Sequence, residues 1–182
     1  MKKESSAAYI ASLAITLLLI TAVVAAGLAC VNAVTAPEIE ALNAQKTQTA
    51  IEAVLPGGGE EIAFTDDSGI VSTIYKGQSG YAVEVTPAGF NGTVTMMVGV
   101  DNAGKVLGIS IVNHTETAGL GAEAASQGAA GTAFRSQFAG MSGSVSVSKD
   151  GGQVDALTGA TITSRAVCTG VNAALNAVAK LG

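Results

Sequence analysis

The stretch that decides the fold is residues 93–112, which read TVTMMVGVDNAGKVLGISIV. Its two halves, 93–101 and 105–112, are rich in β-branched residues and largely alternate in polarity, as strands do. Asn102-Ala103-Gly104 lies between them and has the composition of a hairpin turn. We therefore predict an antiparallel hairpin here and build the rest of the domain outward from it.

Shorter runs of the same kind flank this hairpin, and helical patterns lie at both ends of the strand region. Residues 37–55 place apolar side chains at helical spacing, and residues 163–179 carry a second such stripe that we expect to form a closing helix. Residues 122–143 show little pattern and predict a short helix with loops. Strands grouped before a closing helix indicate an α+β fold, with an antiparallel sheet covered on one side. The further strands that we expect are 62–65, 70–75, 81–86 and 144–148.

An uncharged apolar segment precedes this domain. Residues 8–31 exceed the roughly 20 residues that a membrane-spanning helix needs. Lys2 and Lys3 precede the segment and the next basic residue is Lys46, so we expect residues 1–7 in the cytoplasm and the domain outside it. A cleaved signal peptide is one alternative, although its apolar core is normally shorter. A lipoprotein site at Cys30 is another, although Gly27 stands where that signal normally has Leu.

Composition argues against several classes of function. The net charge of −5 is unlike that of a nucleic-acid-binding protein, which needs a basic patch. The cysteines are Cys30 and Cys168 and the one histidine is His114, so the usual zinc and iron–sulfur sites cannot be built from this chain alone. We find neither a Gly-x-Gly-x-x-Gly motif that opens a helix after a strand nor a Ser-His-Asp constellation. We therefore predict no metal site and no catalytic residue.

Residues 155–164, DALTGATITS, carry the strongest chemical signal. Apolar residues at helical spacing follow them, so a helix begins within this run. The unpaired N–H groups and the positive dipole at a helix start favour a phosphate group. Gly159 and Ala160 leave room for a bulky ligand against the backbone. Two interpretations follow from these residues: Thr161 or Thr163 caps the helix, or Thr161 carries a phosphate-linked group.

This run resembles the attachment sequence of the covalent-FMN protein family. In that family a flavin transferase joins FMN, through a phosphodiester, to the last Thr of [Ser/Thr]-Gly-Ala-Thr. The resemblance implies that Thr161 carries the FMN, with Thr158, Thr163 and Ser164 as the rival hydroxyls. The neighbours that it implies around the bound FMN are Thr158, Gly159, Ala160 and Thr163.

Residues 114–121, HTETAGLG, resemble a second motif of the family, the His-x-Glu-Thr-Pro-Gly-Leu-Gly loop that lies against the flavin. Ala118 replaces the usual Pro, so we expect a less rigid loop. His114 either touches the flavin or only braces the loop, and a lone histidine at a strand end is more often structural. The noncovalent flavin contacts that the resemblance implies are Glu116, Thr117, Leu120 and Gly121.

Over the N-terminal anchor and from about residue 77 onward, the chain is similar to the G subunits of Rnf electron-transport complexes. It is less similar to the C subunits of the sodium-pumping NADH:quinone reductase. The resemblance implies an electron relay with covalent FMN, in a complex that moves electrons between ferredoxin and NAD and exports sodium ions or protons. The implied partners are the other membrane subunits, a flavin transferase and membrane lipid.

These expectations divide the chain into four parts: a cytoplasmic N-terminus over 1–7, a transmembrane helix over 8–31, a membrane-proximal helix with linking strands over 32–76, and an extracytoplasmic FMN-binding domain over 77–182. Two other functions stay open. One is a stand-alone membrane-anchored flavoprotein that feeds an extracytoplasmic reductase. The other is a noncatalytic anchored binding domain without flavin.

Overall fold

The computed structural model describes residues 6–66 and 68–181, with side chains from residue 8 onward. Lys2 and Lys3, on which the expected orientation in the membrane depends, lie outside the described residues. The chain divides into two compact units, Met1–Ala44 and Gln45–Gly182.

The first unit is helical. Helix α1 (Ser6–Val54) runs through it and continues into the second unit, with Pro37 inside it, so residues 37–55 do not form a helix of their own. The hydroxyls of Thr16, Thr21 and Thr35 donate to carbonyls one turn back, at 2.8–3.0 Å, which satisfies these polar groups within the helix itself. Among the described residues, α1 is the one helix long and apolar enough to cross a membrane. That property is what a spanning segment requires.

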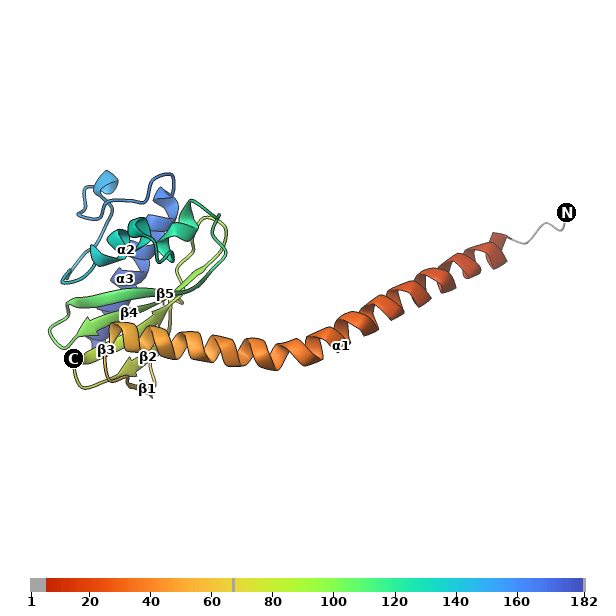
Figure 1. Ribbon diagram of the computed structural model, residues 1–182, viewed down its shortest axis with the longest axis horizontal. Coiled ribbons are helices and arrows are strands. Elements are labelled where there is room, and N and C mark those ends of the chain that lie inside the picture. The colour runs from red at the N-terminus through yellow and green to blue at the C-terminus, as the bar shows by residue number, and fades with distance from the viewer. Residues whose placement is uncertain (1–5, 67, 182) are drawn as a thin grey trace. The chain divides into compact units, whose positions relative to one another are not determined.

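The second unit is built on a five-stranded antiparallel sheet in the order β1-β2-β3-β4-β5 (Figure 1). The predicted hairpin is confirmed as its two longest strands, and the carboxylate of Asp101 holds the turn by accepting the N–H groups of Ala103 at 2.9 Å and Lys105 at 2.8 Å. The α+β class is therefore confirmed. The strands are β1 (Glu60–Ile62), β2 (Val71–Lys76), β3 (Gly80–Val85), β4 (Val94–Asp101) and β5 (Val106–His114).

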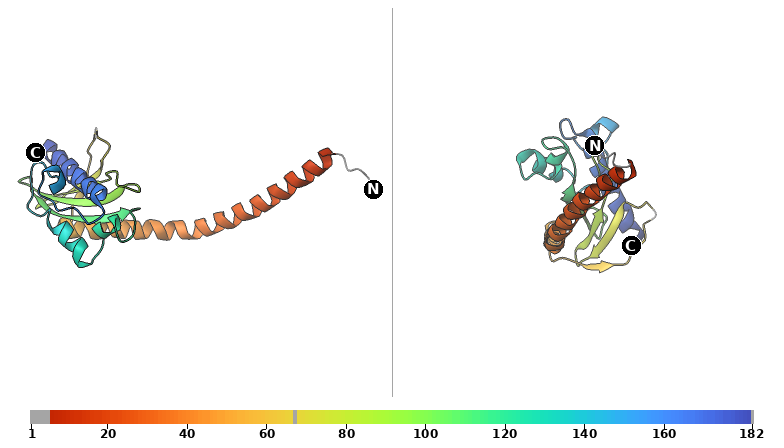
Figure 2. Two further views of the ribbon diagram at one scale, coloured as in Figure 1. Left: turned by 90° about the horizontal axis from the view of Figure 1, so that it is seen from above. Right: turned by 90° about the vertical axis from the view of Figure 1, so that its right-hand side faces the viewer.

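Helices cover both faces of this sheet, whereas the sequence predicted cover on one side. Helix α3 (Thr161–Leu181) lies on one face (Figure 2). Its buried apolar side chains share one cluster with Val85, Met96 and Val98. The end of α1 packs on the other face, where Val54 belongs to a second apolar cluster with Met97. The strand alternation explains both layers, because Met96 and Met97 point to opposite faces and are both fully buried.

The predicted strand at 144–148 is wrong. The backbone N–H and carbonyl of Val145 bond instead to the amide side chain of Asn172 on α3, both at 2.8 Å, and Val147 makes only an isolated parallel bridge to Val154. A side chain thus takes the place that a neighbouring strand would hold. The other short elements are the 3-10 helices η1 (Gly121–Ala124) and η2 (Ser148–Asp150) and the helix α2 (Ala129–Ser136).

Two glycines that face each other across β4 and β5 provide a test of this layering. Gly99 pairs with Gly108, but a Cβ on Gly99 would lie 2.3 Å from the Val54 carbonyl oxygen, whereas a Cβ on Gly108 meets nothing within 4 Å. Gly99→Ala should therefore lower the free energy of unfolding by about 1–3 kcal/mol through overpacking. Gly108→Ala, the matched control, should stay within about 0.5 kcal/mol of wild type. Denaturant unfolding measures both, and equal effects would contradict packing of α1 on β4.

Candidate functional site

The hydroxyl-rich turn leads directly into α3. Gly159 has φ of 73°, in the left-handed region, and a Cβ on it would also lie 2.9 Å from Leu120 Cδ2. The backbone conformation thus favours glycine at position 159, whereas the exposed Leu120 side chain could move aside. Thr161 is the first residue of α3, so the N–H groups of the first turn have no acceptor within the helix and point out of its end.

The four hydroxyls near the turn have different environments. Ser164 is fully buried, donates to the Ala160 carbonyl at 2.9 Å and accepts the Leu157 N–H at 3.0 Å. Thr163 is also buried and donates to the carboxylate of Glu116 at 2.6 Å. Ser164 and Thr163 are therefore occupied in holding the turn.

The other two hydroxyls are accessible. Thr158 is exposed and lines a cavity of about 560 Å³ beside α2. Thr161 is half-buried and lines a different cavity, where its Oγ1 accepts a hydrogen bond from Lys149 Nζ at 3.2 Å. Thr161 thus combines an open hydroxyl, a neighbouring cation and the start of a helix.

Glu116 joins three separate segments through one carboxylate. Its Oε1 accepts the backbone N–H groups of Phe90 at 2.8 Å and Asn91 at 3.1 Å, in the turn between β3 and β4, and its Oε2 accepts the Thr163 hydroxyl. Burial acts to raise the pKa of Glu116, but the bond from Thr163 and the backbone bonds from Asn91 and Phe90 outweigh it and hold the pKa below its usual value. The group is therefore a charged, fully engaged acceptor at neutral pH.

The loop after β5 is folded tightly against this carboxylate. The Thr117 carbonyl accepts the N–H groups of Leu120 at 3.2 Å and Ala122 at 3.1 Å, which closes the loop into η1. A Cβ on Gly121 would lie 2.4 Å from Glu116 Oε2 and 2.5 Å from Thr163 Oγ1. Glycine at 121 therefore allows the two predicted motifs to meet.

An ion pair places the cation beside Thr161. Asp150 in η2 and Arg165 in α3 form two hydrogen bonds of 2.7 Å each, and the bond to Arg165 holds the pKa of Asp150 below its usual value. Lys149 is the residue before Asp150, so this pair brings its side chain to the first turn of α3. Sequence reasoning missed Lys149, because nothing local shows that η2 folds back onto α3.

The cavity at Thr161 has a volume of about 300 Å³. It brings together eight predicted residues from both motifs, and three residues that were not predicted, Phe90, Lys149 and Ile162, also line it. Thr158 and His114 are not among its lining residues. The eight predicted residues are Glu116, Thr117, Leu120, Gly121, Gly159, Ala160, Thr161 and Thr163.

His114 ends β5, two residues before Glu116. Its Nδ1 is the buried side-chain nitrogen or oxygen without a hydrogen-bond partner among the described residues. The Coulombic interaction with His114 makes the smallest contribution to the lowered pKa of Glu116. His114 thus lies at the start of the loop and does not line the Thr161 cavity.

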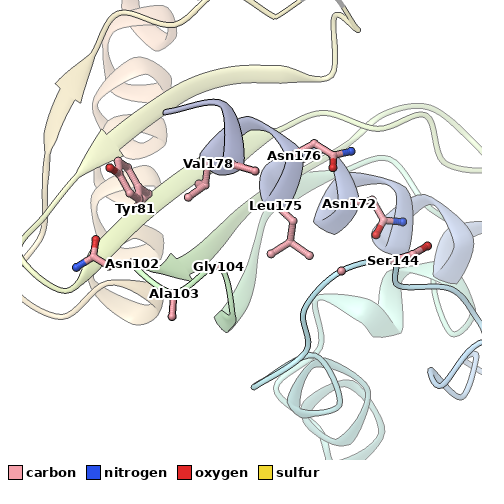
Figure 3. A pocket seen from close by; sticks show the side chains of 11 residues that line it. Tyr81, Asn102, Ala103, Gly104, Ser144, Asn172, Leu175, Asn176 and Val178 are labelled. Carbon is pink, nitrogen blue, oxygen red and sulfur yellow. The ribbon is translucent and has the colours of Figure 1, made fainter. Parts of the chain in front are cut away.

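A larger cavity, of about 680 Å³, lies between the C-terminal half of α3 and the turn from β4 to β5 (Figure 3). Tyr81, Asn102, Asn172 and Asn176 supply its polar side chains, together with Ser144. Asn172 is already engaged with the backbone of Val145. None of the residues that the two motifs predicted lines this cavity, so its size alone does not make it the candidate site.

The titration of Glu116 gives a prediction. Because its pKa is lowered in the folded protein, its contribution to stability is present above the unfolded value of about 4.5 and is lost as the pH falls through the folded value. Glu116→Gln should lower the free energy of unfolding by about 2 kcal/mol at pH 7, because it weakens hydrogen bonds to a charged group. The difference between the two proteins should shrink at pH 3.

Denaturant unfolding of wild type and Glu116→Gln at the two pH values measures this. Asp66 and Asp150, whose pKa values are also lowered, are present in both proteins and cancel in the difference. An unchanged difference from pH 7 to pH 3 would show that Glu116 is not ionised in its hydrogen-bonded position.

The region that matches a known protein family contains the whole of this site. Residues 89–176, which include every residue that lines the Thr161 cavity, match the model of the FMN-binding domain family. The G subunit of the Na⁺-translocating ferredoxin:NAD⁺ oxidoreductase complex of Acetobacterium woodii is 35% identical to this chain, over 88% of the chain and 87% of the relative. The G subunit of the ion-translocating oxidoreductase complex of Methanosarcina acetivorans is 32% identical, over 90% and 92%.

A third relative, matched over a shorter part of the chain, is also a G subunit of such a complex. The G subunit of the proton-translocating ferredoxin:NAD⁺ oxidoreductase complex of Clostridium ljungdahlii is 40% identical over 54% of this chain and 52% of its own length. The first two matches span nearly the whole of both proteins, which a shared cofactor-binding segment alone would not produce. The chain therefore belongs to the family of G subunits of ion-translocating oxidoreductase complexes and contains that family's FMN-binding domain.

Proposed function

We propose that this chain is the electron-relay subunit of an Rnf-type ferredoxin:NAD oxidoreductase and carries FMN joined covalently to Thr161. The observation that supports the attachment position most directly is the difference among the hydroxyls. Ser164 and Thr163 are buried and engaged, whereas Thr161 opens into the cavity. Thr158 opens into a different one.

The residues around the cavity suit FMN. The N–H groups at the start of α3 and the ammonium group of Lys149 would hold the phosphodiester, since both attract an anion. Gly159 lines the cavity and has no side chain that would keep a cofactor away from the backbone. Leu120 and Ile162 offer apolar surface to the isoalloxazine ring. The carboxylate oxygens of Glu116 accept hydrogen bonds from the protein itself, so Glu116 acts by holding the segments around the cavity together.

A flavin exchanges electrons singly or in pairs, so it can connect unlike carriers. The role of this chain is then to hold that group in place and set its surroundings. The named relatives belong to complexes that transfer electrons between ferredoxin and NAD⁺, with Na⁺ or protons as the translocated ion. We assign the nicotinamide chemistry and the ion movement to other membrane subunits, which are the proposed partners together with a flavin transferase.

The apolar helix and the family make this a membrane protein. We infer that it crosses the bilayer once, with residues 1–7 in the cytoplasm, 8–31 in the bilayer, and the linking part and the FMN-binding domain of 77–182 outside. The positive charges of Lys2 and Lys3 before the apolar segment support this orientation.

The attachment residue is tested by substitution. Thr161→Ala should abolish the flavin fluorescence that stays with the wild-type chain in an SDS gel, because no phosphodiester can form. Thr158→Ala, the matched control in the same turn, should retain it. Mass analysis of the flavin peptide after expression with a flavin transferase gives the position directly. Flavin found on Thr158 or Thr163 would overturn the assignment.

The same Thr161→Ala variant tests the relay role. Membranes that carry it should lose ferredoxin-to-NAD electron transfer and the coupled ion uptake in parallel, by at least 10-fold, while the other subunits still copurify. Loss of flavin with normal coupled activity would instead favour a stand-alone flavoprotein. A wild-type protein that never carries flavin would favour the noncatalytic binding domain.

The orientation has its own test. Protease added to intact spheroplasts should digest the domain that follows residue 44, whereas a cytoplasmic marker protein should stay intact. Protection until the cells are lysed would reverse the proposed topology. An N-terminus that begins at Cys30 would show a lipoprotein instead.

A further inference from the structure

An aromatic side chain outside both motifs stands at the cavity. Phe90 lies in the turn between β3 and β4 and is 67% exposed, although it is one of the largest apolar side chains of the domain. Leu120 and Ile162, from two other segments, line the same cavity and are 44% and 48% exposed. A single exposed apolar residue is ordinary, but three from separate segments around one cavity form a surface that a ligand can cover.

The turn that carries Phe90 is firmly held. Gly89 donates to the Gly92 carbonyl at 2.6 Å, which closes the turn. Asn91 and Thr115 exchange two further bonds: the Asn91 amide donates to the Thr115 carbonyl at 2.9 Å, and the Thr115 hydroxyl donates to the Asn91 carbonyl at 2.8 Å. With the two backbone bonds to Glu116, the turn is tied at Phe90 and Asn91 to the loop that follows β5.

Its glycines show how closely the two segments approach. A Cβ on Gly89 would lie 2.3 Å from Glu116 Oε1. Gly92 has φ of 139°, and a Cβ there would lie 2.2 Å from Thr115 Oγ1. The backbone of the turn is thus packed directly on residues 115 and 116, and the side chain of Phe90 is left at the cavity.

We propose that Phe90 is a flavin-binding residue that packs on the isoalloxazine ring, and that Glu116 is the residue that positions it. This inference rests on the proposed function. A phosphodiester at Thr161 holds only the phosphate end of FMN, and the flexible ribityl chain leaves the ring to be held by contacts. An aromatic face on a firmly held turn supplies such a contact. The Glu116 carboxylate accepts hydrogen bonds both from the Phe90 backbone and from Thr163, two residues after the attachment position. It therefore fixes the position of Phe90 relative to Thr161.

The experiment uses the full chain, flavinylated by coexpression with a flavin transferase and purified in detergent. The variants are Phe90→Ala, Phe90→Tyr and Leu107→Ala. Leu107 is a matched control because it is an exposed leucine on β5 that does not line the cavity. The readouts are flavin retained in SDS, quenching of native flavin fluorescence by iodide, fluorescence anisotropy, and melting temperature.

We expect the Phe90 and Leu107 variants to retain SDS-stable flavin as wild type does and to melt within about 2 °C of it, since exposed side chains contribute little to stability. Phe90→Ala should at least double the iodide quenching constant and lower the anisotropy, because the ring loses a contact and gains access to solvent. Phe90→Tyr and Leu107→Ala should match wild type. Glu116→Gln should move both fluorescence readouts in the direction of Phe90→Ala while Thr161 stays modified.

Other outcomes overturn the inference in recognisable ways. If Phe90→Ala matches wild type in quenching and anisotropy, Phe90 does not touch the flavin. If Phe90→Ala lacks SDS-stable flavin while the other variants keep it, the flavin transferase needs Phe90 to recognise the chain. Absence of SDS-stable flavin from wild type would overturn the proposed function, and this inference with it.

Discussion

The site depends on the three hydrogen bonds that Glu116 accepts. They join the turn between β3 and β4, the loop after β5 and the first turn of α3, which are far apart in the sequence. A buried carboxylate is costly unless its acceptors are used, and here the donors come from the two segments that must meet the loop carrying Glu116. The same interaction that keeps the charge tolerable therefore assembles the cavity.

The sheet supplies the rigid support for that assembly. β4 is buried on both faces, by α3 on one side and by the end of α1 on the other, so the strand ends that carry the site loops are held from two directions. The functional loops lie at one end of α3 and the charge-free cavity of Tyr81 and Asn176 lies toward its other end. The surroundings of Thr161, by contrast, include a cation and helix N–H groups, which makes this end of α3 suited to an anion.

Sequence predicted those parts of the fold and site that have a local signature. Alternation and a turn identify β4 and β5, and helical spacing identifies α3. The two motifs bring most of the cavity lining, and both proved to lie together. The rest depends on contacts between distant segments. The predicted strand at 144–148 was wrong because Asn172 satisfies the backbone of Val145. Phe90 and Lys149 were missed because contacts between distant segments, the bonds to Glu116 and Thr115 and the Asp150–Arg165 pair, bring them to the cavity.

The modest size of the cavity has a consequence for how tightly it must bind. A space of about 300 Å³ with exposed apolar walls can enclose only part of a cofactor, and it stays open toward solvent. For a freely diffusing ligand this would mean easy loss. With the attachment proposed at Thr161, the flavin ring would instead have an effective concentration of the order of millimolar at its own site, as for other short flexible linkers. Weak local affinity would then suffice for occupancy, and the ring edge would remain open to an incoming electron carrier.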